Sequence, residues 1–74
     1  MDAVLALRAL AAILEDPALC RRFLALSGFD PQTLRARAAA PETAEAVAAF
    51  LAGHEPDLIR VAGQLGVPPE YLAR

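Results

Sequence analysis

A helix stop followed at once by a helix start, at Gly28 and Asp30-Pro31, constrains this fold more than any other feature of the chain. Glycine is favoured just past a helix end because it tolerates left-handed backbone. Aspartate accepts hydrogen bonds from the free N–H groups of the helix that follows, and proline fits its first turn. The stretch therefore predicts two short helices joined by a tight turn, and nothing in it points to chemistry.

Similar signals divide the rest of the chain. Asp16-Pro17 begins a helix, Pro41 forces a new start because proline disfavours helical geometry in the preceding residue, and Gly53 and Gly66 follow predicted helix ends. The predicted helices span residues 2–15, 16–28, 31–39, 41–52 and 56–65, with a last short turn over 70–74. Valine, isoleucine and threonine are too scattered for strands. We predict an all-α single domain over residues 1–74, a compact bundle of four to six short helices.

The predicted core comes from apolar residues at helical spacing. In the first helix they form the stripe Val4, Leu7, Leu10, Ala11 and Leu14. This helix is apolar nearly all round, which indicates either a central position in the bundle or an interface, and we favour the central position. In the later helices the predicted core residues are Leu19, Phe23 and Leu26, then Leu34 and Ala38, then Val47, Phe50 and Leu51, and finally Leu58, Val61, Ala62 and Leu65.

Size, charge and cysteine content narrow the class of protein. At 74 residues the chain is near the lower limit for a self-sufficient core, so we expect a protein partner or a homodimer. All the basic residues are arginines, and the net charge is −2. The single cysteine allows no internal disulfide, and no apolar run is long enough to span a bilayer. These observations together predict a cytoplasmic protein.

The C-terminal part carries an HTH-like helix-turn-helix corner at Ala62, Gly66, Val67 and Leu72. A small alanine lets two helices cross closely, and glycine allows the sharp turn. A DNA-reading helix, however, places polar and basic side chains at its N-terminal end. Those positions hold Pro68, Pro69 and Glu70 in this chain. A negatively charged chain also lacks the charge that neutralises phosphates, so nucleic acid is not the expected partner.

The candidates for binding a partner are one basic cluster and two apolar side chains. The basic cluster consists of Arg21, Arg22, Arg35 and Arg37. It either docks an acidic partner or nucleic acid, or it is a solvated helix face paired with Glu15, Asp16 or Asp30, and we favour the solvated face. The apolar candidates are Leu5 and Phe50, from the first and fourth predicted helices.

No residue pattern indicates catalysis, a cofactor or a metal. His54 has no second ligand at metal-binding spacing and no nucleophile near it in sequence, so we expect it to cap or pack a helix. Cys20 is expected to be a small buried apolar residue. Gly63, inside a predicted helix, indicates close approach of another helix or, alternatively, a partner site. We therefore predict that the protein is not an enzyme, and we expect no small-molecule substrate.

Several motifs together resemble those of a known family. They are F-L-A-L-S-G at 23–28, Pro31 with Leu34-Arg35, Phe50-Leu51 with Glu55 and Leu58, and G-V-P-P-E at 66–70. Through them the chain resembles a family of short proteobacterial proteins catalogued as domain of unknown function three-five-seven-two. The resemblance implies a bacterial, cytoplasmic, all-helical protein, and it assigns no activity, ligand or catalytic residue.

Two functions stand as hypotheses. The first is a non-enzymatic protein–protein interaction module or adaptor, monomeric or homodimeric, which binds through an apolar patch near the first or fourth helix. The excess of apolar residues over what a small core needs motivates this hypothesis. The alternative is a DNA-associated or transcription-linked accessory that uses the C-terminal HTH-like corner.

Overall fold

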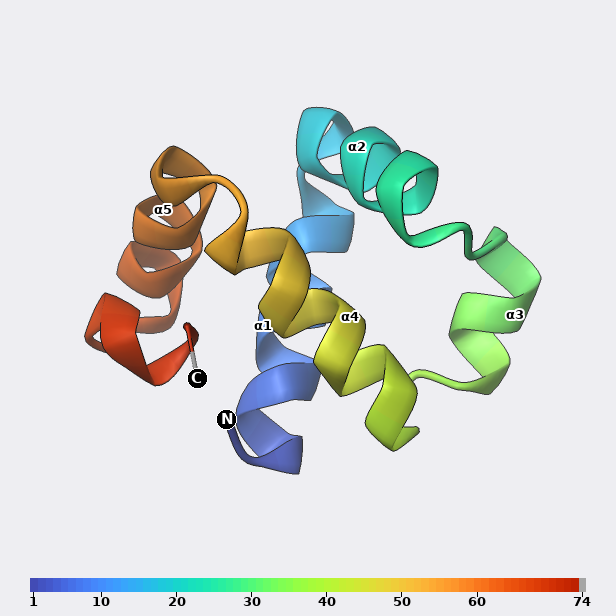
Figure 1. Cartoon of the computed structure of the whole chain (residues 1–74), viewed down its shortest axis with the longest axis horizontal. Helices are drawn as coiled ribbons and strands as arrows, with labels where there is room; N and C mark the ends of the chain where they lie inside the picture. The colour runs from blue at the N-terminus through green and yellow to red at the C-terminus, as the bar shows by residue number, and fades with distance from the viewer. Residues whose placement is uncertain (74) are drawn as a thin grey trace.

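The computed structural model describes residues 1–73, and over that range the secondary structure is entirely helical (Figure 1). The helices are α1 (Ala3–Glu15), α2 (Pro17–Ser27), α3 (Pro31–Ala36), α4 (Pro41–Ala52) and α5 (Glu55–Leu65), followed by the 3₁₀ turn η1 (Pro69–Tyr71). The predicted all-α class and the bundle of short helices are confirmed. One predicted boundary is wrong: α3 ends at Ala36, earlier than residue 39. The predicted last turn over 70–74 overlaps η1, and its final residue, Arg74, lies outside the described residues.

The predicted stop and start residues form the helix ends. Asp2, Asp16 and Asp30 each precede a helix, and each carboxylate accepts a hydrogen bond from a backbone N–H of the first turn, at 2.7, 3.0 and 2.8 Å. Gly28 and Gly66 follow helix ends with φ angles of 77° and 70°, in the left-handed region. These local signals set the helix boundaries because they satisfy backbone groups that a helix end leaves unpaired.

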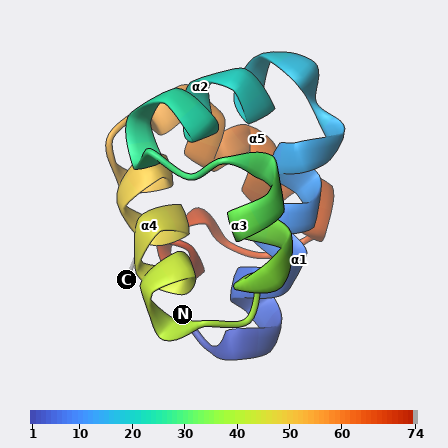
Figure 2. The ribbon, with the colours of Figure 1, turned by 90° about the vertical axis from the view of Figure 1, so that its right-hand side faces the viewer.

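The first helix, α1, is central on one side only, because it buries one face against the bundle and leaves the other exposed. It packs against α2, α4 and α5, and α4 in turn packs against α2 and α5. The helices α3 and α5 lie toward opposite ends of the longest dimension, which measures 30 Å (Figure 1). The view turned by 90° shows α3 nearest the viewer at its end of the molecule (Figure 2).

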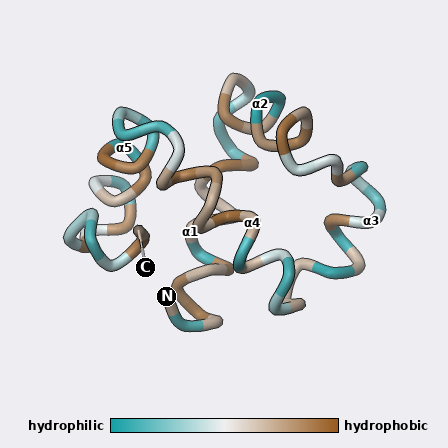
Figure 3. The backbone as a smooth tube through the Cα atoms, viewed as in Figure 1, coloured by the Kyte–Doolittle hydropathy of each residue, from teal (hydrophilic) through white to brown (hydrophobic). Residues whose placement is uncertain are grey.

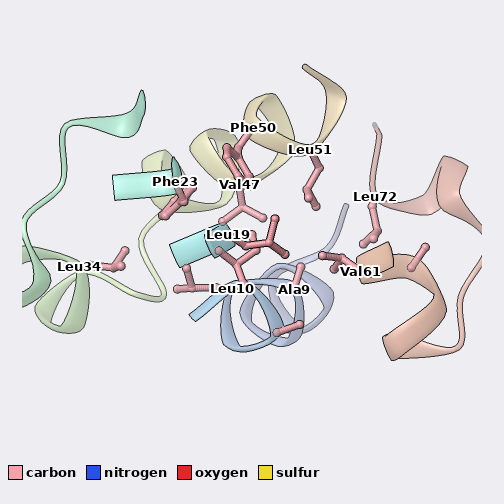
Figure 4. Close-up of a cluster of buried hydrophobic side chains, with 13 residues drawn as sticks. Ala9, Leu10, Leu19, Phe23, Leu34, Val47, Phe50, Leu51, Val61 and Leu72 are labelled. Atoms are coloured by element: carbon pink, nitrogen blue, oxygen red, sulfur yellow. The ribbon is translucent and has the colours of Figure 1, made fainter. Parts of the chain in front are cut away.

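The core is one cluster of side chains from every helix (Figure 4). Its largest fully buried members include Ile13, Leu19, Phe23, Val47, Leu51, Val61 and Leu72. The rings of Phe23 and Phe50 meet edge to face, with centroids 5.3 Å apart, a favourable arrangement for two aromatic quadrupoles. Figure 3 shows α2 and α5 alternating between hydrophobic and hydrophilic residues, as expected for helices with one buried face.

The predicted core stripe of α1 is wrong, because only its Leu10 is buried. Val4, Leu7 and Leu14 are 69%, 39% and 41% exposed, and Ala11 is also exposed. The residues that α1 buries are Ala6, Ala9, Leu10, Ala12 and Ile13. An almost wholly apolar helix offers two faces of similar hydropathy, and the inner face is the one rich in alanine. Small side chains let three neighbouring helices approach the central helix closely, which bulkier residues would prevent.

Three smaller expectations are also wrong. Leu26 is 73% exposed, because Phe23 and the half-buried Leu24 occupy the inner side of α2. Gly63 has open space around it: a Cβ built there would meet nothing within 4 Å, so no other helix approaches closely. Cys20, predicted to be buried, is half-buried.

Over the described residues, no helix has the length and apolar character needed to cross a bilayer.

Candidate functional site

The predicted C-terminal corner forms a tight turn. Ala62 and Leu72 are buried, Gly66 is left-handed, and the backbone N–H of Val67 donates to the Ala62 carbonyl at 3.1 Å. The described residues after this turn form the three-residue 3₁₀ turn η1 and then Leu72 and Ala73, where a helix-turn-helix would have a second α-helix. The HTH-like character predicted for this corner is therefore not confirmed.

The four arginines of the predicted basic cluster have different surroundings. Arg22 forms an ion pair with Asp57, and Arg37 forms one with Glu42. These partners differ from the predicted ones, Glu15, Asp16 and Asp30. Arg22 borders a hollow between α2 and α4, whereas Arg35 borders a separate hollow between α1, α2 and α3. Arg21 is exposed on α2.

Asp57 is the most buried charged residue of the described part of the chain, and the sequence-based prediction missed it. Its carboxylate accepts a hydrogen bond from Arg22, and its Oδ2 lies 3.0 Å from Nδ1 of His54. His54 precedes α5 at the N-cap position, but its side chain makes no capping hydrogen bond. It therefore contacts Asp57 rather than the helix end. The sequence did contain a signal for the burial of Asp57, because Asp57 lies four residues before Val61 and so on the face that α5 buries.

A hollow of about 360 Å³ lies beside this cluster. Its lining residues are Arg22, Leu26, Ala49, Phe50, Gly53 and His54. The guanidinium of Arg22 lies 5.8 Å from the centroid of the Phe50 ring, within the range of a cation–π contact. Among the described residues, no three His, Cys, Asp or Glu side chains are placed to hold a metal ion. Arg22 and His54 thus serve to satisfy a buried carboxylate, which is costly to leave unpaired.

The two apolar partner-binding candidates have packing roles. Phe50 is 8% exposed and belongs to the core, with one edge of its side chain bordering the hollow described above. Leu5 is half-buried and packs against the core cluster. The apolar surface that α1 exposes comes instead from residues predicted to be buried.

We name this surface the outer stripe of α1; it consists of Val4, Leu7, Ala11 and Leu14. The spacing of three, four and three residues puts all four on one side of the helix. Two charged residues, Arg8 and Glu15, follow Leu7 and Leu14 directly and border the stripe along one edge. A hollow of about 400 Å³ lies between Arg8 and Glu15. Its other lining residues are Ala11, Ala12, Gln64 and Leu65.

The fold and the outer stripe together define a small all-α domain in which one face of α1 is exposed. The family described as "Protein of unknown function (DUF3572)" has a model that matches residues 2–74. The chain belongs to this family, and the resemblance seen in its sequence motifs is confirmed. Comparison with curated proteins and with solved structures gave no significant match.

Proposed function

We propose that this protein is a non-enzymatic interaction module that binds a protein partner through the outer stripe of α1. The observation that carries the proposal is the exposure of three large apolar side chains on one face of the central helix: Val4 at 69%, Leu7 at 39% and Leu14 at 41%. Neighbouring apolar groups exposed on a regular element are typical of surfaces that a partner covers.

The stripe is also presented in a rigid form. From Val4 to Leu14 it covers about 15 Å of helix, at a rise of about 1.5 Å per residue. The opposite face of α1 is packed in the core, so binding orders little that is not already ordered. Fully burying an exposed leucine side chain contributes about 1.5–3 kcal/mol. Leu7 and Leu14 are 39% and 41% exposed, so each should add roughly 1 kcal/mol when a partner covers it.

The alternative, a DNA-associated accessory, draws less support. The C-terminal corner has Glu70 in the first turn of η1, where a carboxylate repels a phosphate backbone. The ion pairs of Arg22 and Arg37 with Asp57 and Glu42 also reduce the positive charge that the basic cluster offers to a polyanion.

The proposal is tested by affinity capture with Leu7→Asp. A tagged wild-type chain is incubated with extract of the cells in which it occurs, and bound proteins are quantified by mass spectrometry. Leu7→Asp should reduce recovery of the partner at least tenfold because it places a charge in the stripe. Ile59→Asp is the matched control, since Ile59 is 52% exposed on α5.

Both variants must retain the circular dichroism and the melting curve of the wild type, which shows that the fold is intact. Equal recovery of every bound protein by the wild type, Leu7→Asp and Ile59→Asp would contradict the proposal. A partner lost from both variants would also contradict it, because the binding surface would then not be specific to α1.

A further inference from the structure

We infer that the partner covering the outer stripe is a second copy of this chain, held in an antiparallel pair of α1 helices about a two-fold axis at Ala11. The inference rests on the function proposed above and specifies its partner.

The spacing of the apolar and charged groups on α1 matches a two-fold pair. Leu7 and Leu14 are seven residues apart, and so are Arg8 and Glu15. The midpoints of both pairs fall within half a residue of Ala11. A two-fold axis there brings Leu7 against Leu14 of the second copy, and Arg8 against Glu15 of the second copy. Each contact then occurs twice, as a symmetric interface requires.

The charges that border the stripe are complementary in the same arrangement. Glu15 is exposed and has no ionic partner among the described residues, although three other acidic side chains do. Arg8 is exposed and donates from one guanidinium nitrogen to the Leu65 carbonyl at 3.1 Å. That bond holds the guanidinium beside the stripe and leaves further N–H donors for a carboxylate. Two ion pairs of opposite direction would therefore flank the leucine contacts.

The shape of the outer stripe also fits a second copy. Ala11 lies at the centre of the arrangement, and its small side chain allows two helix backbones to approach closely. The hollow between Arg8 and Glu15 provides space for the side chains of Arg8 and Glu15 of the second copy. A parallel pair is less favourable, because it places Arg8 level with Arg8 and Glu15 level with Glu15 of the second copy.

The size of the stripe predicts a weak, reversible dimer. A standard interface buries about 800 Å² on each partner, and a single helix face of about 20 Å in length covers less than this. The total accessible surface of one chain is 4483 Å². We therefore expect a dissociation constant on the order of 10–100 μM, with exchange between monomer and dimer.

A charge-swap experiment tests the pairing by sedimentation equilibrium between about 10 μM and about 1 mM, the range in which such a dimer dissociates. Arg8→Glu and Glu15→Arg should each weaken the dimer at least tenfold, because each creates two like-charge contacts. The double variant restores opposite charges and should return the dissociation constant to within about threefold of wild type. Arg21→Glu, on the exposed side of α2, is the control and should leave dimerisation unchanged.

Cross-linking tests the orientation in a Cys20→Ser background. Mild oxidation of a mixture of Leu7→Cys and Leu14→Cys chains should give disulfide-linked dimers between the two variants. Leu7→Cys alone should give at least tenfold fewer. Efficient cross-linking of Leu7→Cys alone would contradict the antiparallel arrangement, because it requires the same position of both copies to meet.

The outcomes for the dimer and for the interaction module are distinguishable. A wild-type chain that stays monomeric at about 1 mM overturns the dimer. If Arg8→Glu and Glu15→Arg each weaken the dimer but the double variant does not regain the wild-type dissociation constant, the proposed ion pairs are overturned. If the wild-type chain stays monomeric and a different protein is captured by it and lost from Leu7→Asp alone, the interaction module stands while the second copy is excluded as its partner.

Discussion

Arg22 of α2 donates a hydrogen bond to Asp57 at the start of α5, across 35 positions of sequence. The Asp57 side chain is 8% exposed and that of Arg22 is 42% exposed, so the acid is nearly buried while its partner reaches solvent. A second ion pair, between Arg60 and Asp16 at 3.6 Å, connects α5 with the junction of α1 and α2. Polar contacts therefore join segments that are distant in sequence around the apolar core.

Asp57→Asn should lower the free energy of unfolding by about 1–2 kcal/mol. The amide keeps the shape of the side chain but removes the charge that Arg22 and His54 satisfy. Glu42→Gln is the matched control, since Glu42 also lies in the first turn of a helix and pairs with an arginine, but is half exposed. It should cost less than about 0.5 kcal/mol. Urea unfolding measures both values, and equal losses would show that burial of Asp57 is not decisive.

Alanine at Gly63 and at Gly66 should have opposite effects on stability. A Cβ meets nothing within 4 Å at either position, so the backbone alone determines the outcome. Gly63→Ala should raise the free energy of unfolding by about 0.5–1 kcal/mol, because alanine favours helix. Gly66→Ala should lower it by about 1–2 kcal/mol, because φ is 70° there. Thermal and urea unfolding test the pair, and a loss of stability in Gly63→Ala would contradict the open surroundings of that residue.

Removal of one methyl group should distinguish the core from the surface. Ile13 is fully buried in α1, whereas Ile59 is 52% exposed on α5. Ile13→Val should lower the free energy of unfolding by about 0.5–1.5 kcal/mol, through lost transfer free energy and a small cavity. Ile59→Val should change it by less than about 0.5 kcal/mol. A larger loss at Ile59 than at Ile13, in denaturant unfolding, would contradict the burial of α1.

The cap of α3 should titrate in a way that depends on Thr33. The backbone N–H and the hydroxyl of Thr33 donate to the Asp30 carboxylate and lower its pKa below the ordinary value of 3.8. Because the folded-state pKa is depressed, the stabilisation is present above the ordinary value and is lost as pH falls through the folded-state pKa. Thr33→Val should raise the pKa of Asp30 part of the way back, because it removes the hydroxyl donor.

Thr33→Ser is the control for this titration, since serine keeps both donors. An NMR titration of the Asp30 carboxyl group gives the pKa in each variant. The same titration curve in Thr33→Val and Thr33→Ser would show that the hydroxyl does not contribute to the cap.

The helix ends were predictable because their signals are local. Asp30 and Gly28 act on backbone groups within a few residues, so the sequence around them was sufficient. The inner face of α1 was not predictable in this way. Leucines and alanines surround that helix, and which face is buried depends on how closely α2, α4 and α5 approach it, which periodicity within one helix does not reveal.

The candidate site also depends on contacts between helices, which the sequence of one helix does not reveal. The partners of Arg22 and Arg37 were missed because ion pairs depend on which helices meet, and Asp57 is 35 positions away from Arg22. The residues of the outer stripe were recognised as an apolar set, but they were assigned to the core. Only the positions of the surrounding helices indicate that Val4, Leu7 and Leu14 lie on the free side of α1.

The helix α3 is attached to the rest of the domain by few buried contacts. Leu34 is the one buried side chain of this six-residue helix, and in Figure 4 it lies apart from the other labelled core residues. At the C-terminal end of α3, the Thr43 hydroxyl donates a hydrogen bond to the Arg37 carbonyl at 2.6 Å. The amide protons of α3 should therefore exchange with solvent through a local opening, at a lower free energy than those of α1, while the remaining helices stay folded.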